Sequence, residues 1–251
     1  MNIQTMRQNR DCADSRFRRL MSVLLVILLG SVLSASAQDS PRAVIEPQSW
    51  DFGYLPQKSE VSHLFYLHNA GSAPLTVSKI RAVCSCTSVS GIDEPIAPGD
   101  SAAILVTFKT GRYHSRVKKP NYVHTDDPEN PAQSMQIVAN VVKDDEPTGD
   151  IAIEPLRLKW KIVEGRIAPE MDSLAIVNNA ENPVTVSVLH APHSVVNAID
   201  LPVEIAPGNA GKALLHISGE AGLSELKGLS ITLSFAGQDT TIITIPIEIE
   251  D

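Results

Sequence analysis

From residue 43 onward, apolar positions occur in short runs separated by turn residues. Residues 61–68, 102–108 and 229–235 combine β-branched, leucine or aromatic residues with interleaved polar positions. Such alternation is typical of strands with one buried face, and the Asn, Pro, Gly and Asp residues between the runs favour turns. No window of 11 or more residues has a helical period. The pattern predicts about seven short strands per half and an all-β fold of β-sandwiches.

The same landmarks occur twice along the chain. They are Ile45-Glu46-Pro47, Trp50, Asn69-Ala70 and Ala97-Pro98-Gly99, and then Ile153-Glu154-Pro155, Trp160, Asn179-Ala180 and Ala206-Pro207-Gly208. Corresponding residue numbers differ by 108 to 110, a period that fits two tandem domains better than a solenoid. We predict one sandwich over residues 38–143, a linker over residues 144–150 and a second, diverged sandwich over residues 151–251.

Local details of these strands follow from residue type. Trp50 and Phe52 are two residues apart, so both are predicted to point inward from the first strand, with Trp160 in the equivalent strand. Gly53 is expected to start a turn. Pro246 lacks an N–H, which predicts that the last strand, residues 240–249, is an edge strand or carries a bulge.

The first 37 residues resemble a secretory signal. Five arginines precede an apolar run over residues 20–33, and Ala35-Ser36-Ala37 follows it. This pattern predicts cleavage after Ala37 and a periplasmic or secreted protein. The apolar run is shorter than the roughly 20 residues of a membrane span. An uncleaved inner-membrane anchor is the alternative, and Cys12 precedes the run, so it is not a lipid-acceptor cysteine.

Removing residues 1–37 makes the chain more acidic. The prefix contains 5 Arg and 2 Asp, so 16 of the 21 basic and 27 of the 29 acidic residues remain, a net charge of −11. A surface of this charge repels nucleic acid and anionic lipid. Residues 112–119 are locally basic, which indicates a charged strand edge. No nucleic-acid partner is therefore expected, and contact with a membrane only if the signal remains as an anchor.

Several motifs of the first half occur together in a known family. They are Trp50-Asp51-Phe52-Gly53, residues 65–71, Pro74-Leu75-Thr76-Val77, Cys84-Ser85-Cys86-Thr87 and residues 95–101. Residues 43–142 thus resemble a bacterial secreted domain family of unknown function with a Cys-Gly-Cys-Thr motif, itself similar to abnormal-spindle/hydin domains. The resemblance implies a seven-stranded immunoglobulin-like sandwich and no known activity.

This sequence departs from the family pattern in two places. Ser85 stands where the family has glycine, and His124-Thr125-Asp126 stands where it has Thr-Asn. The second half lacks the cysteine pair, and His190 and His193 lie near the corresponding position.

Cys84 and Cys86 are the only cysteines after residue 37. In an oxidising compartment they are the one pair available for an intramolecular disulfide. Residues i and i+2 of a regular strand are about 6.6 Å apart, the upper limit for a bridge, and a turn at Ser85 would bring them closer. So short a loop adds little stability.

Three interpretations of the pair remain open. It is a structural pair, an exchangeable redox pair, or a thiolate pair that binds a soft metal such as Cu(I). Zinc would need two further ligands, and no histidine pair has the expected spacing. The sequence favours the structural interpretation and assigns no metal or cofactor.

Other candidate motifs favour structural roles. Asp126, Asp127 and Glu129 lack the spacing of a calcium loop and predict a solvated turn. The histidines are scattered and no nucleophile signature occurs, so the chain is not expected to be an enzyme.

The predicted function is a binding or scaffolding module for an envelope protein. An exposed edge strand or the loops at a sandwich end would provide the contact. The alternatives are redox or Cu(I) handling at the cysteines, or an accessory role toward cell-envelope carbohydrate. The carbohydrate role is disfavoured because both tryptophans are at core-like positions.

Overall fold

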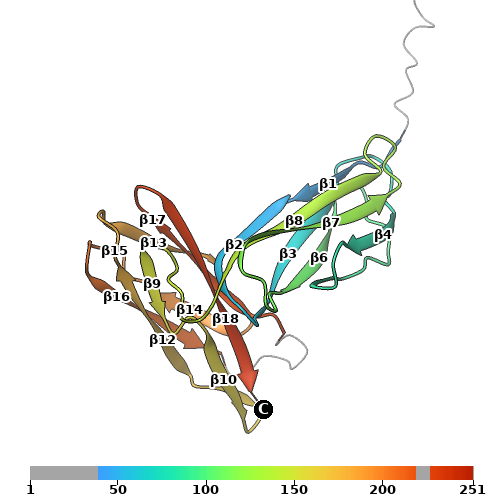
Figure 1. Cartoon of the computed structure of the whole chain (residues 1–251). Helices are drawn as coiled ribbons and strands as arrows, with labels where there is room; N and C mark the ends of the chain where they lie inside the picture. The colour runs from blue at the N-terminus through green and yellow to red at the C-terminus, as the bar shows by residue number, and fades with distance from the viewer. Residues whose placement is uncertain (1–38, 219–226, 251) are drawn as a thin grey trace, which may run out of the picture. The chain divides into compact units, whose positions relative to one another are not determined.

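The computed structural model describes residues 39–218 and 227–250, which form eighteen β-strands and contain no helix (Figure 1). The predicted all-β class is therefore confirmed. Within these ranges no helix is long and apolar enough to cross a membrane. The predicted signal in residues 1–37 lies outside the described residues and stays a prediction.

The first half contains eight strands arranged in two facing sheets. The strands are β1 (Ala43–Glu46), β2 (Ser49–Pro56), β3 (Glu60–Asn69), β4 (Val77–Ala82), β5 (Thr87–Val89), β6 (Ser101–Lys109), β7 (Ser115–Thr125) and β8 (Ala132–Val142). One sheet has the order β1-β3-β6-β5 and the other the order β2-β8-β7-β4. This is the strand order of an immunoglobulin-like sandwich. Phe52, Phe65 and Phe108 are fully buried in its core.

The second half repeats this order with ten strands. They are β9 (Ile151–Glu154), β10 (Leu158–Val163), β11 (Arg166–Ala168), β12 (Met171–Asn178), β13 (Val184–His190), β14 (Val196–Asp200), β15 (Glu204–Ile205), β16 (Ala210–Ile217), β17 (Ser230–Ala236) and β18 (Thr240–Glu250). The sheet β14-β16-β12-β9 faces the strands β15-β13-β17-β18, with β10 paired to β18 and β11 paired to β10. Trp160 and Phe235 are fully buried in this separate core.

The first strand of each half is split between the two sheets. β1 pairs with β3 and β2 runs parallel to β8, while β9 pairs with β12 and β10 runs parallel to β18. The two segments meet at the cis peptide bonds Glu46–Pro47 and Glu154–Pro155. Trp50 lies opposite Ile137 and Trp160 opposite Ile249. Trp50 and Trp160 therefore lie in equivalent strands, as predicted, but not at equivalent positions. Trp50 follows its cis proline by three residues and Trp160 by five, so Trp160 aligns with Phe52.

The asparagine that corresponds to Asn69 in the second half is one residue away from the predicted Asn179. Asn69 Nδ2 donates to the carbonyls of Ala73 and Ile96, at 2.8 and 2.9 Å. Asn178, and not Asn179, makes the same two bonds in the second half, to Asn182 and Ile205, both at 2.9 Å. The predicted partner Asn179 is wrong because the side chain that ties two loops together must itself be buried, as Asn178 is.

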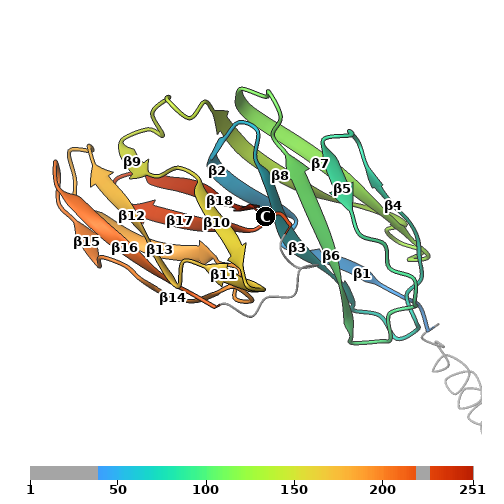
Figure 2. The same ribbon diagram turned by 90° about the horizontal axis from the view of Figure 1, so that it is seen from below.

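One sheet runs through both halves, which the sequence did not predict (Figure 2). β18 lies beside β2, with Ile243 opposite Tyr54. Thr244 Oγ1 donates to the Phe52 carbonyl at 2.6 Å and is 2.9 Å from Thr232 Oγ1, and this seam is buried. The described residues from 40 onward therefore form one compact unit with two cores. That each half folds as a domain of its own stays a prediction.

Gly53 makes this close approach possible, and it does not start a turn as predicted. It lies inside β2 at a bulge, with φ of +62°, and its N–H donates to Asp51 Oδ1 at 2.8 Å. A Cβ at this position would lie 1.9 Å from the carbonyl oxygen of Ile242. Only glycine accepts both the positive φ and the contact with β18.

The prediction that the last strand is an edge strand is also wrong. β18 is an inner strand, with β17 on one side and β2 and β10 on the other. The N–H of Ile247 points toward β17, where it donates to Leu229. Backbone groups alternate in direction along a strand, so Pro246 faces the other side. On that side β18 pairs with β2 at Ile243 and with β10 at Ile247, and Pro246 lies between these two pairing positions. No N–H is therefore needed there.

Two further predictions concern charged residues. Residues 115–120 of β7 pair with β8 alone, so the basic segment does lie along a strand edge, as predicted. Asp127, by contrast, is buried and accepts N–H bonds from Ala43, Glu129 and Asn130. Burial alone would raise the pKa of Asp127, but these bonds outweigh it and hold the pKa below its ordinary value. The predicted solvated turn is thus wrong at this residue.

Candidate functional site

A cleft of about 680 Å³ lies where the two halves meet, and we call it the junction cleft. The first half contributes side chains from β3, β5 and β6, on the outer face of the sheet β1-β3-β6-β5. The second half contributes Pro192 and Ser194 after β13, and residues 227–229 before β17. The backbone joins there as well, because the Ser62 N–H donates to the Gly228 carbonyl at 2.9 Å.

The floor of the junction cleft is apolar. Leu64 and Leu105 lie opposite each other on β3 and β6, and each keeps 40% of its surface exposed. Tyr66, 41% exposed, continues this stripe along β3. Leucine and tyrosine side chains that are exposed side by side on one sheet face are typical of a contact surface.

Polar groups surround this floor. The hydroxyls of Ser62 and Thr107 hydrogen-bond to each other at 2.8 Å. Lys109 and Glu60 form an ion pair of 3.0 Å whose side chains are both partly exposed. The two hydroxyls therefore connect the facing positions Ser62 and Thr107 of β3 and β6.

Three aromatic rings from both halves lie next to the cleft. The Trp50 indole stacks on the His63 imidazole, with ring centroids 3.8 Å apart and planes 9° apart. His190 comes from the end of β13, and its ring centroid is 6.1 Å from Trp50 and 5.9 Å from His63. Trp50 packs against the core of the first half, as its predicted inward direction requires, but it is only partly buried, and its ring also lies where the two halves meet.

Two nitrogen atoms of this aromatic group have no partner in the described part of the chain. Trp50 Nε1 and His63 Nδ1 are both buried, and neither makes a hydrogen bond there. Burial lowers the pKa of His63 to about 4, and the neighbouring His190 lowers it as well. Burial and then the nearby His193 lower the pKa of His190. Both imidazoles are therefore neutral at pH 7.

Cys84 and Cys86 lie in the turn between β4 and β5 and are joined by a disulfide, with Cα atoms 5.2 Å apart. The Thr87 N–H donates to the Cys84 carbonyl at 3.3 Å, which closes the turn expected at Ser85. Both cysteines are half-buried and Ser85 is exposed. The turn that carries the pair adjoins the junction cleft through its backbone, because the cleft residue Lys109 donates its N–H to the Cys86 carbonyl at 2.8 Å.

No group of three His, Cys, Asp or Glu side chains placed to hold a metal ion occurs within residues 39–218 and 227–250. A Cu(I) site at the cysteines would therefore rest on two sulfurs alone, and these are bonded to each other here. Copper binding would require prior reduction of the disulfide.

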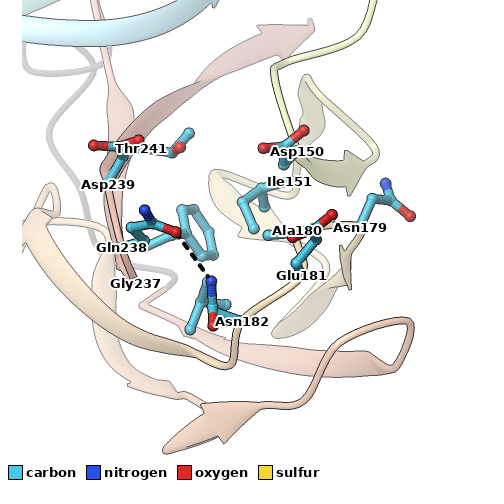
Figure 3. Close-up of a pocket in the computed structure, with 12 residues that line it drawn as sticks. Asp150, Ile151, Asn179, Ala180, Glu181, Asn182, Gly237, Gln238, Asp239 and Thr241 are labelled. Atoms are coloured by element: carbon cyan, nitrogen blue, oxygen red, sulfur yellow. Dashed lines mark hydrogen bonds between the residues drawn. The ribbon is translucent and has the colours of Figure 1, made fainter.

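A second hollow, of about 410 Å³, lies at one end of the second sandwich (Figure 3). Polar side chains line it, including Asp150, Glu181 and Asp239, and Asn182 Nδ2 donates to Gln238 Oε1 at 3.2 Å. A hollow of about 430 Å³ occurs between the corresponding loops of the first half, near Gly71. Since the fold produces such a hollow twice, we assign it no function of its own.

Residues 43–141 match the family described as "Protein of unknown function (DUF1573)". This match confirms the resemblance predicted for residues 43–142, and it covers the first sandwich. A comparison with curated proteins gives no match.

Solved structures with similar strands have low sequence identity. A protein of unknown function from Porphyromonas gingivalis W83 is 14% identical with a TM-score of 0.35, and the match covers 82% of this chain and 99% of that one. The E. coli chaperone DraB is 10% identical with a TM-score of 0.33, over 84% and 97%. An ASH/PapD-like domain of human CEP192 is 14% identical with a TM-score of 0.33, over 44% and 92%.

Sequence reasoning found the cysteine pair but missed the junction cleft, His63 and the stack on Trp50. A signal for the cleft was present in β3. Phe65 and Leu67 point into the core, yet Leu64 and Tyr66 on the opposite face are also apolar. A strand that is apolar on both faces indicates that its outer face has a second contact.

Proposed function

We propose that this chain is a binding module of the cell envelope, without catalytic turnover of its own, that holds a protein partner in the junction cleft. The observation that carries the proposal is the apolar floor formed by Leu64 and Leu105, placed between two rigid sandwiches and rimmed by hydrogen-bonding groups. Binding sites for polypeptides combine an apolar floor with a few polar groups at the rim in this way.

The chemistry of the cleft favours a polypeptide over the other ligand classes. The net charge of −11 expected for the processed chain disfavours nucleic acid and anionic lipid. Carbohydrate platforms use exposed aromatic faces, whereas Trp160 is buried and one face of Trp50 is covered by His63. Leucine side chains beside hydroxyls and an ion pair fit an extended peptide with apolar side chains.

Site-specific crosslinking tests the proposal in the living cell. A photoreactive amino acid replaces Leu105 in the cleft, and in a matched variant it replaces Val203, which is 83% exposed on the second half. We expect a discrete crosslinked protein from position 105 and none from position 203. Adding Leu64→Glu should abolish the product, because the carboxylate places a charge on the apolar floor. Equal crosslinking from both positions, or none from position 105, would refute the proposed site.

A further inference from the structure

The turn with the disulfide has an equivalent in the second half, and the two turns can be compared directly. In the first half the turn after β4 contains Cys84 and Cys86, and the Thr87 N–H donates to the Cys84 carbonyl. In the second half the turn after β13 has no cysteine, yet the N–H groups of Val195 and Val196 both donate to the Pro192 carbonyl at 2.9 Å. The fold closes this turn through backbone hydrogen bonds alone, so the disulfide is not needed to form it.

The loop that the disulfide closes is also too short for a mainly stabilising role. Cys84 and Cys86 are two positions apart, and the entropy that a bridge removes from the unfolded chain grows with loop length. A bridge that the turn does not need and that stabilises little is best explained by its chemistry.

The surroundings of the pair fit that chemistry. Cys86 packs against the core, whereas Ser85 beside it is exposed and Cys84 is half-buried. Thr87 Oγ1 lies 3.5 Å from Cys84 Sγ and 3.7 Å from Cys86 Sγ. A hydroxyl within reach of both sulfurs can donate a hydrogen bond to whichever one becomes a thiolate, which stabilises that thiolate.

We propose that the Cys84–Cys86 disulfide is a redox site that exchanges with a dithiol on a protein held in the junction cleft. A partner thiolate attacks Cys84 Sγ, the bond between Cys84 and Cys86 breaks, and Cys86 leaves as a thiolate beside the Thr87 hydroxyl. The second partner thiolate then attacks the partner's sulfur in the mixed disulfide and releases Cys84. Two electrons pass from the partner, which gains a disulfide, to this chain, which becomes a dithiol.

The turn that carries both cysteines adjoins two residues that line the cleft. Ser88, two residues after Cys86, lines the cleft, and Lys109 connects the two through its backbone. The inference extends the proposed function by giving the bound partner a chemical class, a protein with two neighbouring thiols. It rests on that function only for the identity of the partner, because the exchange itself can be measured with a small thiol.

The first experiment measures exchange on the native chain. Purified protein is incubated with graded ratios of reduced to oxidised glutathione at neutral pH, quenched, labelled with a maleimide and digested, and the mass of the Cys84–Cys86 peptide is measured. We expect both sulfurs to be labelled after incubation with reduced glutathione, with an unchanged far-UV circular dichroism spectrum. Labelling only after denaturant is added would overturn the inference and leave a structural bridge, whatever the crosslinking at Leu105 shows.

The second experiment tests the role of Thr87 on the sulfur that leaves. In Cys84→Ser, the remaining thiol of Cys86 is titrated through its reaction rate with iodoacetamide as a function of pH. A matched variant, in which both cysteines are replaced by Ser and Val203→Cys is added, provides an ordinary exposed thiol. We expect Cys86 to become a thiolate at lower pH than this control thiol, and Thr87→Val to reduce the difference by roughly tenfold in thiolate fraction. Identical titration of the two thiols, or no effect of Thr87→Val, would contradict the assignment.

Discussion

Trp50 and Trp160 lie in the equivalent first strands of the two halves and contact equivalent residues, and yet they have different surroundings. Trp160 is fully buried, and its Nε1 donates to Asp172 Oδ2 at 3.0 Å. Trp50 is half-buried, and its indole stacks on His63 while its Nε1 has no partner among the described residues. His63 and Asp172 are themselves equivalent, because each lies six residues before the asparagine that ties the loops of its half.

The residue that meets the indole therefore differs between the two halves, Asp172 in the second and His63 in the first. In the second half a carboxylate satisfies the indole within the same sandwich. In the first half an imidazole stacks on the indole, whose N–H has no partner among the described residues, and His190 of the second half approaches both rings. The comparison teaches that equivalent positions make a contact within one sandwich in the second half and a contact between the halves in the first.

The largest expected effect comes from the two tryptophans themselves. Trp160→Ala should lower the free energy of unfolding by about 3–5 kcal/mol, the usual cost of truncating a buried aromatic residue. Trp50→Ala should cost roughly 2 kcal/mol, because part of its surface is already in water. Urea denaturation followed by circular dichroism measures both. The two are the only tryptophans in the chain, so the fluorescence of each variant reports on the other half. Equal costs would mean that Trp50 is as buried as Trp160.

Gly53→Ala tests whether the junction depends on close approach of β2 and β18. The added methyl would meet the Ile242 carbonyl, and the positive φ disfavours alanine, so we expect a loss of roughly 2–3 kcal/mol in the free energy of unfolding. Gly99→Ala is the matched control, since its φ is +83° with no atom near the added methyl. It should cost about 1 kcal/mol. A similar loss of unfolding free energy in both variants would show that β18 does not approach β2 closely at Gly53.

The smallest expected effect is the pH dependence of the free energy of unfolding that arises from His63, which lies at the position equivalent to Asp172. His63 and His190 are neutral in the folded protein, with the pKa of His63 lowered to about 4, while in the unfolded chain they titrate near 6.5. The unfolded state therefore binds more protons as the pH falls from about 6.5 to 4, and the free energy of unfolding falls across this window. We expect a loss of roughly 1–2 kcal/mol after allowing for partial exposure.

The control for this prediction is His63→Phe, which keeps a ring over Trp50 but cannot be protonated. Its stability should depend less on pH between 6.5 and 4 than that of the wild type, when both are measured by urea denaturation. A pH profile unchanged by the substitution would place the acid sensitivity elsewhere, for example at the buried carboxylate of Asp127.

The sequence indicated the main features of each half because they depend on local pattern. The alternation of apolar residues predicted the strands. The repeated landmarks gave the period that places Trp50 and Trp160 in equivalent strands. The turn at Ser85 followed from the separation that a disulfide allows. The wrong assignments, at Gly53, Pro246 and Asn179, all concern residues whose role is set by a neighbour far away in the chain.

By itself, the sequence determined the all-β class, the duplication and which two cysteines can pair, since periodicity, repeated motifs and residue counts are properties of the chain. Only the tertiary structure decided that one sheet joins both halves, that Trp50 meets His63 and His190, and that the turn with the disulfide adjoins an apolar cleft. Local patterns record which face of a strand is buried, but they do not record which distant strand covers it. β2 and β18 are separated by nearly the whole described chain, and their contact depends on how two complete cores pack.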